Sequence, residues 1–259
     1  LGSPRLHRLR RQRNQQPRLA VPPVRLFLRK GGCRNVNDPF ELLVAAAIKR
    51  FGANLISDRL TRRDRLPLLH GILGAIKTGE FTLSSGAKSD FYIDARLVTL
   101  NPSLMPHVAK AILEHAMSLR ATAIGGPATA AIPMATAAAL LSTTDPLTPI
   151  KKTFYVRPKA KEHGTKSLLE GLAPDDGEIV LLVDDVLTSG NSIGHAAEVV
   201  RREYDGKVSA LVLVDREEGG QERLLESEIT VHALYRKGEL LPLKKALDEL
   251  SKALLGDDS

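Results

Sequence analysis

Two kinds of apolar pattern recur along the chain, and they predict different elements. Leu66, Leu69, Leu73 and Ile76 are spaced by three and four residues, as on one face of a helix. Residues 179–183 are instead continuously apolar, which is typical of a parallel strand buried on both faces. Further strands are expected at 121–124, 153–156, 208–214 and 229–234. Further helices are expected at 38–49, 105–119, 193–204 and 243–254, and an Ala-rich helix is expected to end at about residue 141. Strands that alternate with helices over 120–235 predict an α/β fold with a central, mostly parallel sheet flanked by helices.

A third pattern lies before this region, where apolar and polar residues alternate over 80–96. The apolar members are Phe81, Leu83, Phe91, Ile93 and Ala95. A Ser-Ser-Gly turn at 84–86 separates them into two runs, so the segment predicts a β-hairpin with an exposed edge. Residues 157–171 are polar and aperiodic, which predicts a long loop of the kind that can act as a lid.

Charge divides the chain into parts. Residues 1–37 hold nine Arg, one Lys and no acid, so they carry +10, and the whole chain's +7 leaves −3 for the remaining residues. The composition of 1–37 favours a disordered extension or a mis-assigned upstream start, with a targeting segment and an RNA-binding arm as weaker alternatives. Residues 38–64 are expected to form a short helix and linker of unclear role, and residues 65–259 the functional domain.

Composition narrows the classes of function. The single Cys33 excludes an internal disulfide and favours a reducing, cytoplasmic compartment. No apolar run approaches the length of a membrane span, so no membrane association is expected. Aromatic residues make up only 4% of the chain and Trp is absent, so a stacking platform for nucleic acid is not expected.

The residues that carry chemistry follow the buried strand at 179–183. Asp184 and Asp185 come first, and Thr188–Ser192 is a run of small or hydroxyl-bearing residues before the next helix. Gly190 permits a tight turn, and backbone N–H groups at a helix start can bind a phosphate. Adjacent carboxylates would repel that phosphate, so they suit sugar hydroxyls or a divalent cation. Together these features indicate a ligand with a ribose, a phosphate and a metal-bound group.

This strand, acidic pair and loop resemble the phosphoribosyl pyrophosphate (PRPP) signature of the type I phosphoribosyltransferases. The resemblance implies that family's fold, with a small N-terminal hood at about 65–96. It also implies that Asp184 and Asp185 bind the ribose hydroxyls and that Thr188–Ser192 hold the 5′-phosphate. The PRPP-binding residues implied are Arg157, Lys159, Lys161, His163, Asp184, Asp185, Val186, Leu187, Thr188, Ser189, Gly190, Asn191 and Ser192.

Three further segments resemble the orotate phosphoribosyltransferases in particular. They are the hood at 79–94, the basic loop at 157–164, and Leu213-Val214-Asp215-Arg216. By resemblance, Tyr92, Ile93, Thr188 and Arg216 bind orotate, with the Arg216 guanidinium on its carboxylate. A surface ion pair of Arg216 with Asp215 or Glu217 is the structural alternative. In the family the basic loop closes over PRPP and reaches the neighbouring subunit's site, which implies a homodimer.

The reaction implied is transfer of ribose 5-phosphate from PRPP to orotate, giving orotidine 5′-monophosphate and pyrophosphate in pyrimidine biosynthesis. Lys161, His163 and Arg157 are the expected catalytic residues, and Mg²⁺, held mainly by PRPP near Asp184 and Asp185, the expected cofactor. Ser84, Ala130 and Pro158 depart from basic residues found in some members and reduce the positive charge around pyrophosphate. The alternatives are a purine or uracil phosphoribosyltransferase and a PRPP-sensing, nucleic-acid-binding regulator.

Overall fold

The computed structural model describes residues 39–51, 65–82, 88–144, 148, 150–159 and 167–255. The predicted turn at 84–86, the tail at 1–37, Lys161 and His163 therefore lie outside the described residues. The helices are α1 (Pro39–Phe51), α2 (Leu66–Ala75), α3 (Arg96–Thr99), α4 (Met105–Leu119), α5 (Ala131–Ser142), α6 (Asn191–Glu203), α7 (Gly220–Glu226) and α8 (Lys237–Leu255). The strands are β1 (Ile76–Thr82), β2 (Lys88–Ile93), β3 (Ala123–Gly125), β4 (Lys152–Val156), β5 (Leu169–Gly171), β6 (Ile179–Leu187), β7 (Lys207–Asp215) and β8 (Thr230–Arg236).

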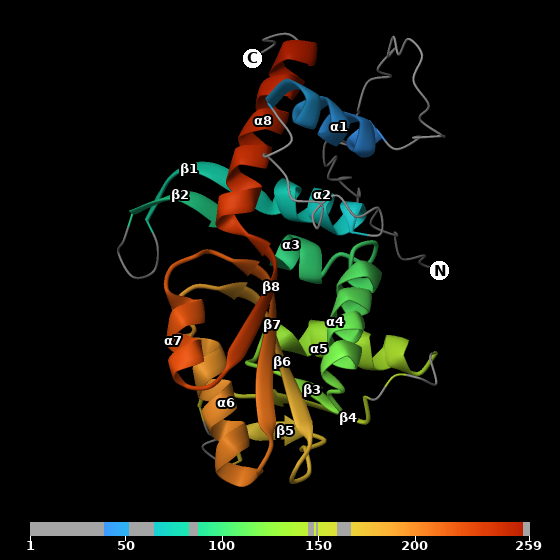
Figure 1. The fold of residues 1–259 in the computed structure, drawn as a ribbon, viewed down its shortest axis with the longest axis vertical. Helices are drawn as coiled ribbons and strands as arrows, with labels where there is room; N and C mark the ends of the chain where they lie inside the picture. The colour runs from blue at the N-terminus through green and yellow to red at the C-terminus, as the bar shows by residue number, and fades with distance from the viewer. Residues whose placement is uncertain are drawn as a thin grey trace, which may run out of the picture.

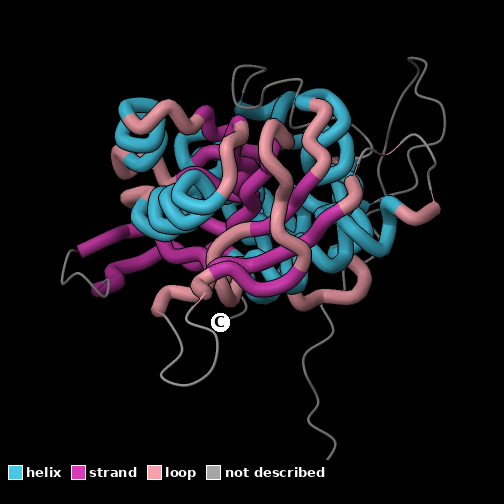
Figure 2. The backbone as a smooth tube through the Cα atoms, turned by 90° about the horizontal axis from the view of Figure 1, so that it is seen from below, coloured by secondary structure: helices cyan, strands magenta, loops and turns pink. Residues whose placement is uncertain are grey.

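The described strands form a large sheet and a separate hairpin. In the large sheet the order is β5-β4-β3-β6-β7-β8, and every pairing except β4 with β5 is parallel. Helices α4 and α5 lie on one side of this sheet and α6 and α7 on the other (Figure 1), and Figure 2 shows helices on both sides of the strands. The hairpin, β1 with β2, stands beside the carboxyl ends of the parallel strands (Figure 1). The predicted α/β fold with a mostly parallel sheet and an N-terminal hood is thus confirmed.

Alternation along β6 divides the interior into two apolar clusters. Leu181 and Val183 belong to the cluster that includes the hood, α4 and α5, whereas Val180 and Leu182 belong to the cluster under α6. Both faces of this strand are therefore buried, as its continuous apolar run predicts. Burial of this kind fixes the position of whatever follows the strand, because neither face can slip in register without exposing apolar side chains.

Several details of the predicted elements were wrong. Ile76, expected on the helix face, instead begins β1, so the hairpin starts before residue 80. β6 continues to Leu187 rather than ending at Val183, because its pairing with β7 extends through Asp184 and Leu187. The loop expected at 157–171 ends in the short strand β5, which pairs with β4 through backbone hydrogen bonds and buries only Leu169. Helix α7 was not expected; it buries Gly220 and Leu224 and is too short to give a repeating pattern.

The hood contains a further difference. Phe91, Ile93 and Ala95 are buried as the alternation predicts. Phe81 is only partly buried, and its ring lies 5.7 Å from that of Tyr92. The pairing of β1 with β2 shifts register between Thr78 and Phe81, and a bulge of this kind changes the face to which the following residues point.

The short helix expected near residues 38–49 is confirmed as α1, which crosses the upper part of α8 (Figure 1). Phe40, Val44 and Ala47 are buried in the same cluster as the hood and α8. The Phe40 ring also stacks on His70 of α2, with ring centroids 4.3 Å apart. No described helix is long and apolar enough to cross a membrane.

Candidate active site

The acidic pair lies within the last part of β6, at the edge of the sheet where the parallel strands end. Asp184 is buried and Asp185 is half-buried, and the Asp185 backbone N–H donates to Asp184 Oδ1 at 3.0 Å. Because side chains alternate along a strand, Asp184 follows the row of Val180 and Leu182, and Asp185 the opposite row. The two carboxyl groups are therefore presented on different faces of the strand end.

Both carboxyl groups are costly to ionise in this position. Burial, followed by the charge of Asp185, raises the pKa of Asp184 to about 8. Burial also raises the pKa of Asp185, while backbone N–H groups and the charge of Arg96 act in the opposite direction. A ligand that brings hydroxyl donors or a cation would relieve this penalty, so the pair is suited to ribose hydroxyls or to a metal.

The loop after the pair has the geometry of an anion-binding turn. Gly190 has φ of +78°, a left-handed conformation that favours glycine, and it directly precedes the first turn of α6. No side chain caps α6 within the described residues. The N–H groups of its first turn have no partner within the helix, which is the arrangement that accepts a phosphate group.

The loop after β3 packs closely beside the acidic pair. A Cβ atom on Gly126 would lie 2.2 Å from the carbonyl oxygen of Val183, so only glycine allows this approach. The Val156 N–H donates to Gly126 O, which ties the loop to the end of β4. The segment 125–127 is thereby held against β6, the strand that carries Asp184. The peptide bond between Ala128 and Thr129 is cis.

Arg216 joins the sheet to the hood. It is buried at the end of β7, and its backbone N–H donates to Leu187 O at 3.0 Å. Its Nη2 donates to Phe91 O in β2 at 3.3 Å, and its guanidinium lies 5.8 Å from the Phe91 ring centroid. Arg216 Nη2 also forms an ion pair with Glu218 Oε1 at 2.8 Å. The ion pair that we considered from the sequence was with Asp215 or Glu217 instead.

The two predicted hood residues are placed differently. Ile93 is buried in the core with Phe91, whereas Tyr92, which faces the other way, is half-buried against Phe81. Their side chains thus lie on opposite faces of β2, because successive residues alternate. Of the two, only the Tyr92 side chain remains accessible enough to meet a ligand.

The predicted basic loop begins where the other strand ends meet. Arg157 directly follows β4, and its backbone N–H donates to Leu168 O at 2.9 Å. The His195 Nε2 atom on α6 lies 3.1 Å from Arg157 O. This contact links the start of the loop to the helix that follows the turn at 188–190, which we call the phosphate turn after its predicted ligand. Lys159 is exposed. Lys161 and His163 lie outside the described residues, so their roles stay predictions.

Sequence reasoning missed Arg96, which stands at the start of α3. Its guanidinium makes two hydrogen bonds to Asp94, at 2.7 and 3.0 Å, and the pair holds the pKa of Asp94 below its usual value. Its charge also opposes the rise in the pKa of Asp185, and Tyr92 is among the groups that raise the pKa of Arg96, after Asp94. The signal was the order Asp94-Ala95-Arg96 directly after a hood strand, in a region where the family resemblance places a base-binding residue.

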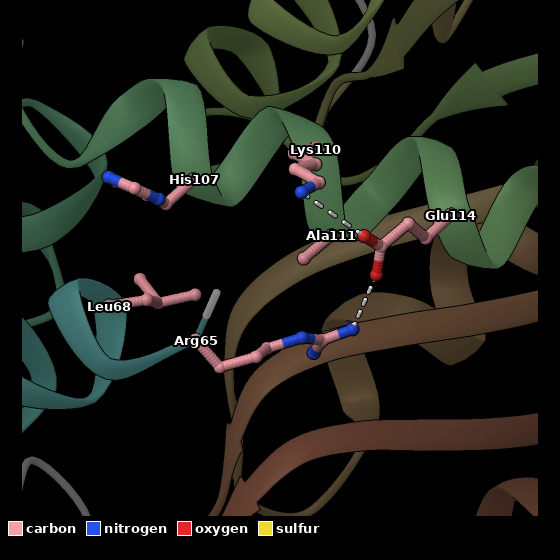
Figure 3. Close-up of a pocket in the computed structure, with 6 residues that line it drawn as sticks. All are labelled: Arg65, Leu68, His107, Lys110, Ala111 and Glu114. Carbon is pink, nitrogen blue, oxygen red and sulfur yellow. Dashed lines mark hydrogen bonds and ion pairs between the residues drawn. The ribbon is translucent and has the colours of Figure 1, made fainter. Parts of the chain in front are cut away.

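One surface pocket lies apart from these residues. Figure 3 shows it between the start of α2 and α4, with Glu114 holding Arg65 at 2.9 Å and Lys110 at 3.9 Å. No residue of the predicted site lines it. Arg65, Lys110 and Glu114 already form ion pairs with one another, and the Arg65–Glu114 pair connects the start of α2 to α4. The pocket is therefore separate from the candidate active site.

The sequence was also compared with known protein families and with individual proteins, and both comparisons identify a family. Residues 99–230 match the profile of the phosphoribosyl transferase domain. An orotate phosphoribosyltransferase from Pyrococcus horikoshii is 40% identical over 169 residues, which cover 64% of this chain and 87% of that protein. One from Pyrobaculum islandicum is 40% identical over 68% of this chain and 89% of its own length. The chain belongs to the orotate phosphoribosyltransferase family.

Solved structures of the family have the same fold. Orotate phosphoribosyltransferase from Mycobacterium tuberculosis, in complex with Fe(III) dicitrate, superposes with a TM-score of 0.57 at 31% identity, covering 68% of this chain and 98% of that one. The enzyme from Aeropyrum pernix superposes with a TM-score of 0.54 at 35% identity, over 69% of this chain and 94% of that one. The Mycobacterium enzyme has also been solved with PRPP bound.

Proposed function

We propose that this orotate phosphoribosyltransferase family member transfers ribose 5-phosphate from PRPP to orotate, giving orotidine 5′-monophosphate and pyrophosphate. The observation that carries the proposal is the convergence at one sheet edge of Asp184, Asp185, the Gly190 turn and Arg216. The relatives' names support orotate as the base. This reaction makes the protein a pentosyltransferase of pyrimidine biosynthesis.

PRPP binds along β6 and the phosphate turn. Asp184 and Asp185 accept hydrogen bonds from the ribose hydroxyls, which offsets the cost of their burial. Residues 186–192 surround the 5′-phosphate with backbone N–H groups and hydroxyls, supported by the open first turn of α6. The sugar is thus held at both ends while its C1′ atom faces the hood.

Orotate binds between the hood and the end of β7. Its carboxylate pairs with the Arg216 guanidinium, whose planar donors suit a bidentate contact. Arg216 is held by Phe91 O and by Glu218, so the guanidinium is already oriented before the base arrives. Tyr92 and Thr188 complete the base site, and Ile93 contributes through the core rather than by contact.

The basic loop supplies charge to the departing pyrophosphate. Arg157 and Lys159 begin it, and Lys161 and His163 are its catalytic groups. Cleavage of the C1′–O bond leaves an oxocarbenium-like ribose and a pyrophosphate with growing negative charge, which fixed cations stabilise. Orotate N1 is acidic enough to attack as an anion, so no strong protein base is required, and a closed loop keeps water from PRPP.

The finer assignments complete the proposal. Asp184 and Asp185 would hold Mg²⁺ through carboxylate oxygens together with oxygens of PRPP, and the bound ion would supply positive charge to the pyrophosphate. A homodimer is supported by two exposed leucines beside the hood, Leu97 and Leu100. The compartment is cytoplasmic, in keeping with a single cysteine.

A base panel with an Arg216 variant tests the proposal. Orotate, uracil, hypoxanthine and adenine are supplied separately with Mg-PRPP, and turnover is expected with orotate. Arg216→Ala should lower kcat/KM for orotate by about 10²-fold or more, because a hydrogen-bonded charge pair is lost. Turnover of a purine or uracil in preference to orotate would contradict the base assignment. Absence of turnover with salt-sensitive binding to nucleic acid would favour the regulator.

A further inference from the structure

Helix α7 packs backbone against backbone on the phosphate turn. A Cβ atom on Gly220 would lie 2.2 Å from Thr188 O and 3.0 Å from Gly190 N. A Cβ atom on Gly190 would in turn meet Gly220 O at 3.0 Å. The turn and α7, which lies beside α6 in Figure 1, are therefore in direct backbone contact that leaves no room for a side chain at either glycine.

One turn further along α7, the Arg223 side chain contacts Asn191, the residue that directly follows the phosphate turn. Its Nη1 donates to the side-chain Oδ1 of Asn191, the first residue of α6, at 2.5 Å. An amide carries its acceptor and its two donors on the same carbon, so this contact decides the orientation of the whole group. With Oδ1 occupied, the Asn191 N–H groups are the ones left for a ligand.

Arg223 is exposed, and its surroundings suit a negatively charged ligand. Within the described part of the chain it makes no ion pair, although Glu222 and Glu226 lie on the same short helix. It lies instead beside the start of α6, where the helix dipole is positive. A cation at that end is unfavourable unless an anion binds nearby, so the arrangement is suited to a phosphate.

The surroundings show why Asn191 needs a fixed partner. Asn191 and Arg223 are both exposed, and with Glu198 they line a cavity of about 190 Å³ between α6 and α7. Without Arg223, the Asn191 amide has room to rotate and to present its oxygen to the phosphate. The partial negative charge of that oxygen would repel the ligand.

On the basis of the proposed function, we propose that Arg223 is a positioning residue for the 5′-phosphate of PRPP. It holds the Asn191 amide with its oxygen occupied and its N–H groups available, and its charge balances that of the bound phosphate. Arg223 thus acts through Asn191 and sets the affinity for PRPP, while the attack of the base depends on other residues.

Kinetics and binding of Arg223→Ala test this role. The KM for PRPP should rise about tenfold, the usual scale for a hydrogen bond to a charged group, with kcat and the KM for orotate within about twofold. Calorimetry with ribose 5-phosphate, without orotate or metal, should show affinity weakened by about the same factor. Arg223→Lys, which keeps a charged donor, should restore most of the affinity.

A double variant and two single variants complete the design. In the Asn191→Ala background, Arg223→Ala should add less than about a twofold loss, because residues that act through one contact are not additive. Arg202→Ala removes the same charge from the exposed last turn of α6 and should leave the affinity for ribose 5-phosphate within about twofold. Asn191→Asp keeps the contact with Arg223 but removes the donors, so it should bind more weakly than Arg223→Ala.

Several results would overturn the inference. They are unchanged affinity for ribose 5-phosphate in Arg223→Ala, losses that add fully in the double variant, or wild-type affinity in Asn191→Asp. The last result remains decisive if Arg223→Ala fails to fold. A wild-type protein that binds ribose 5-phosphate without using orotate contradicts the proposed function, while the variants still decide the role of Arg223. A wild-type protein that does not bind ribose 5-phosphate overturns both.

Discussion

At the scale of single residues, the acidic pair is expensive for the fold and useful for the ligand. Asp184 is buried beside Asp185, and both have raised pKa values because burial disfavours their charge. The folded protein is less stable because these two carboxyl groups are buried at the strand end, but they are fixed in place for a ligand. Sugar hydroxyls or a metal would return part of that cost, so substrate and protein stabilise each other there.

A histidine outside the site predicts a pH dependence of stability. His115 on α4 meets His232 on β8 with ring centroids 4.3 Å apart, and burial, then His232, then Arg65 lower the pKa of His115 to about 4. The unfolded chain binds the proton near pH 6.5, so the folded state loses stability as the pH falls from about 6.5 toward 4. We expect the free energy of unfolding to be about 1 kcal/mol lower at pH 5 than at pH 7.5 from this group, after discounting for its partial exposure.

Denaturant titrations of His115→Gln check this expectation. The variant cannot take up the proton, so its difference between the two pH values should be smaller than the wild type's by about 1 kcal/mol. His107→Gln, on the same helix and beside the pocket of Figure 3, should keep the full difference. An undiminished pH dependence in His115→Gln would show that another group is responsible.

At the scale of elements, the phosphate turn depends on close contact with α7. Comparing Gly→Ala variants at Gly220 and at Gly74 distinguishes the effect of this contact from the effect of helix propensity. Gly220→Ala places a Cβ 2.2 Å from Thr188 O, so we expect a loss of about 1–3 kcal/mol of stability and a KM for PRPP raised several-fold. Gly74→Ala, in α2, meets nothing within 4 Å and should raise stability by roughly 0.5–1 kcal/mol. Thermal unfolding and PRPP titrations measure both; equal behaviour of the two variants would contradict the role of α7.

The same contrast explains which elements could be predicted from sequence. β6 and β7 are long and apolar on both faces, so their patterns were clear even though β6 ended later than expected. β5 and α7 are short and are held by backbone contacts with neighbours that are distant in sequence. No local period records such contacts.

The candidate site divides in the same way. The acidic pair and the turn after it were identified because they follow a continuous apolar run, and Arg216 was identified because its segment resembles the family. Arg96 and Arg223 were not, since their importance comes from proximity across elements rather than from spacing along one. The contribution of Lys161 and His163 stays a prediction.

At the scale of the whole molecule, α1 belongs to the main apolar core rather than to a separate appendage. Val44 is 3% exposed and packs in the cluster shared with α8 and the hood, whereas Ala45 on the same helix is exposed. Val44→Asp buries a charge and should lower the free energy of unfolding by about 3 kcal/mol, with Ala45→Asp near wild type. KM values should change little in either variant, because α1 packs on α8, away from the sheet edge that holds the site (Figure 1). Equal stability of the two variants would show that α1 contributes nothing to the core.

The central claim is that one sheet edge holds PRPP and orotate together for transfer of the ribose phosphate. The most direct measurement is the ultraviolet absorbance of orotate after the protein, PRPP and Mg²⁺ are mixed. We predict a decay whose rate is proportional to protein concentration, requires PRPP, and falls by about 10²-fold or more in Arg216→Ala. A constant absorbance at every protein concentration would contradict the claim.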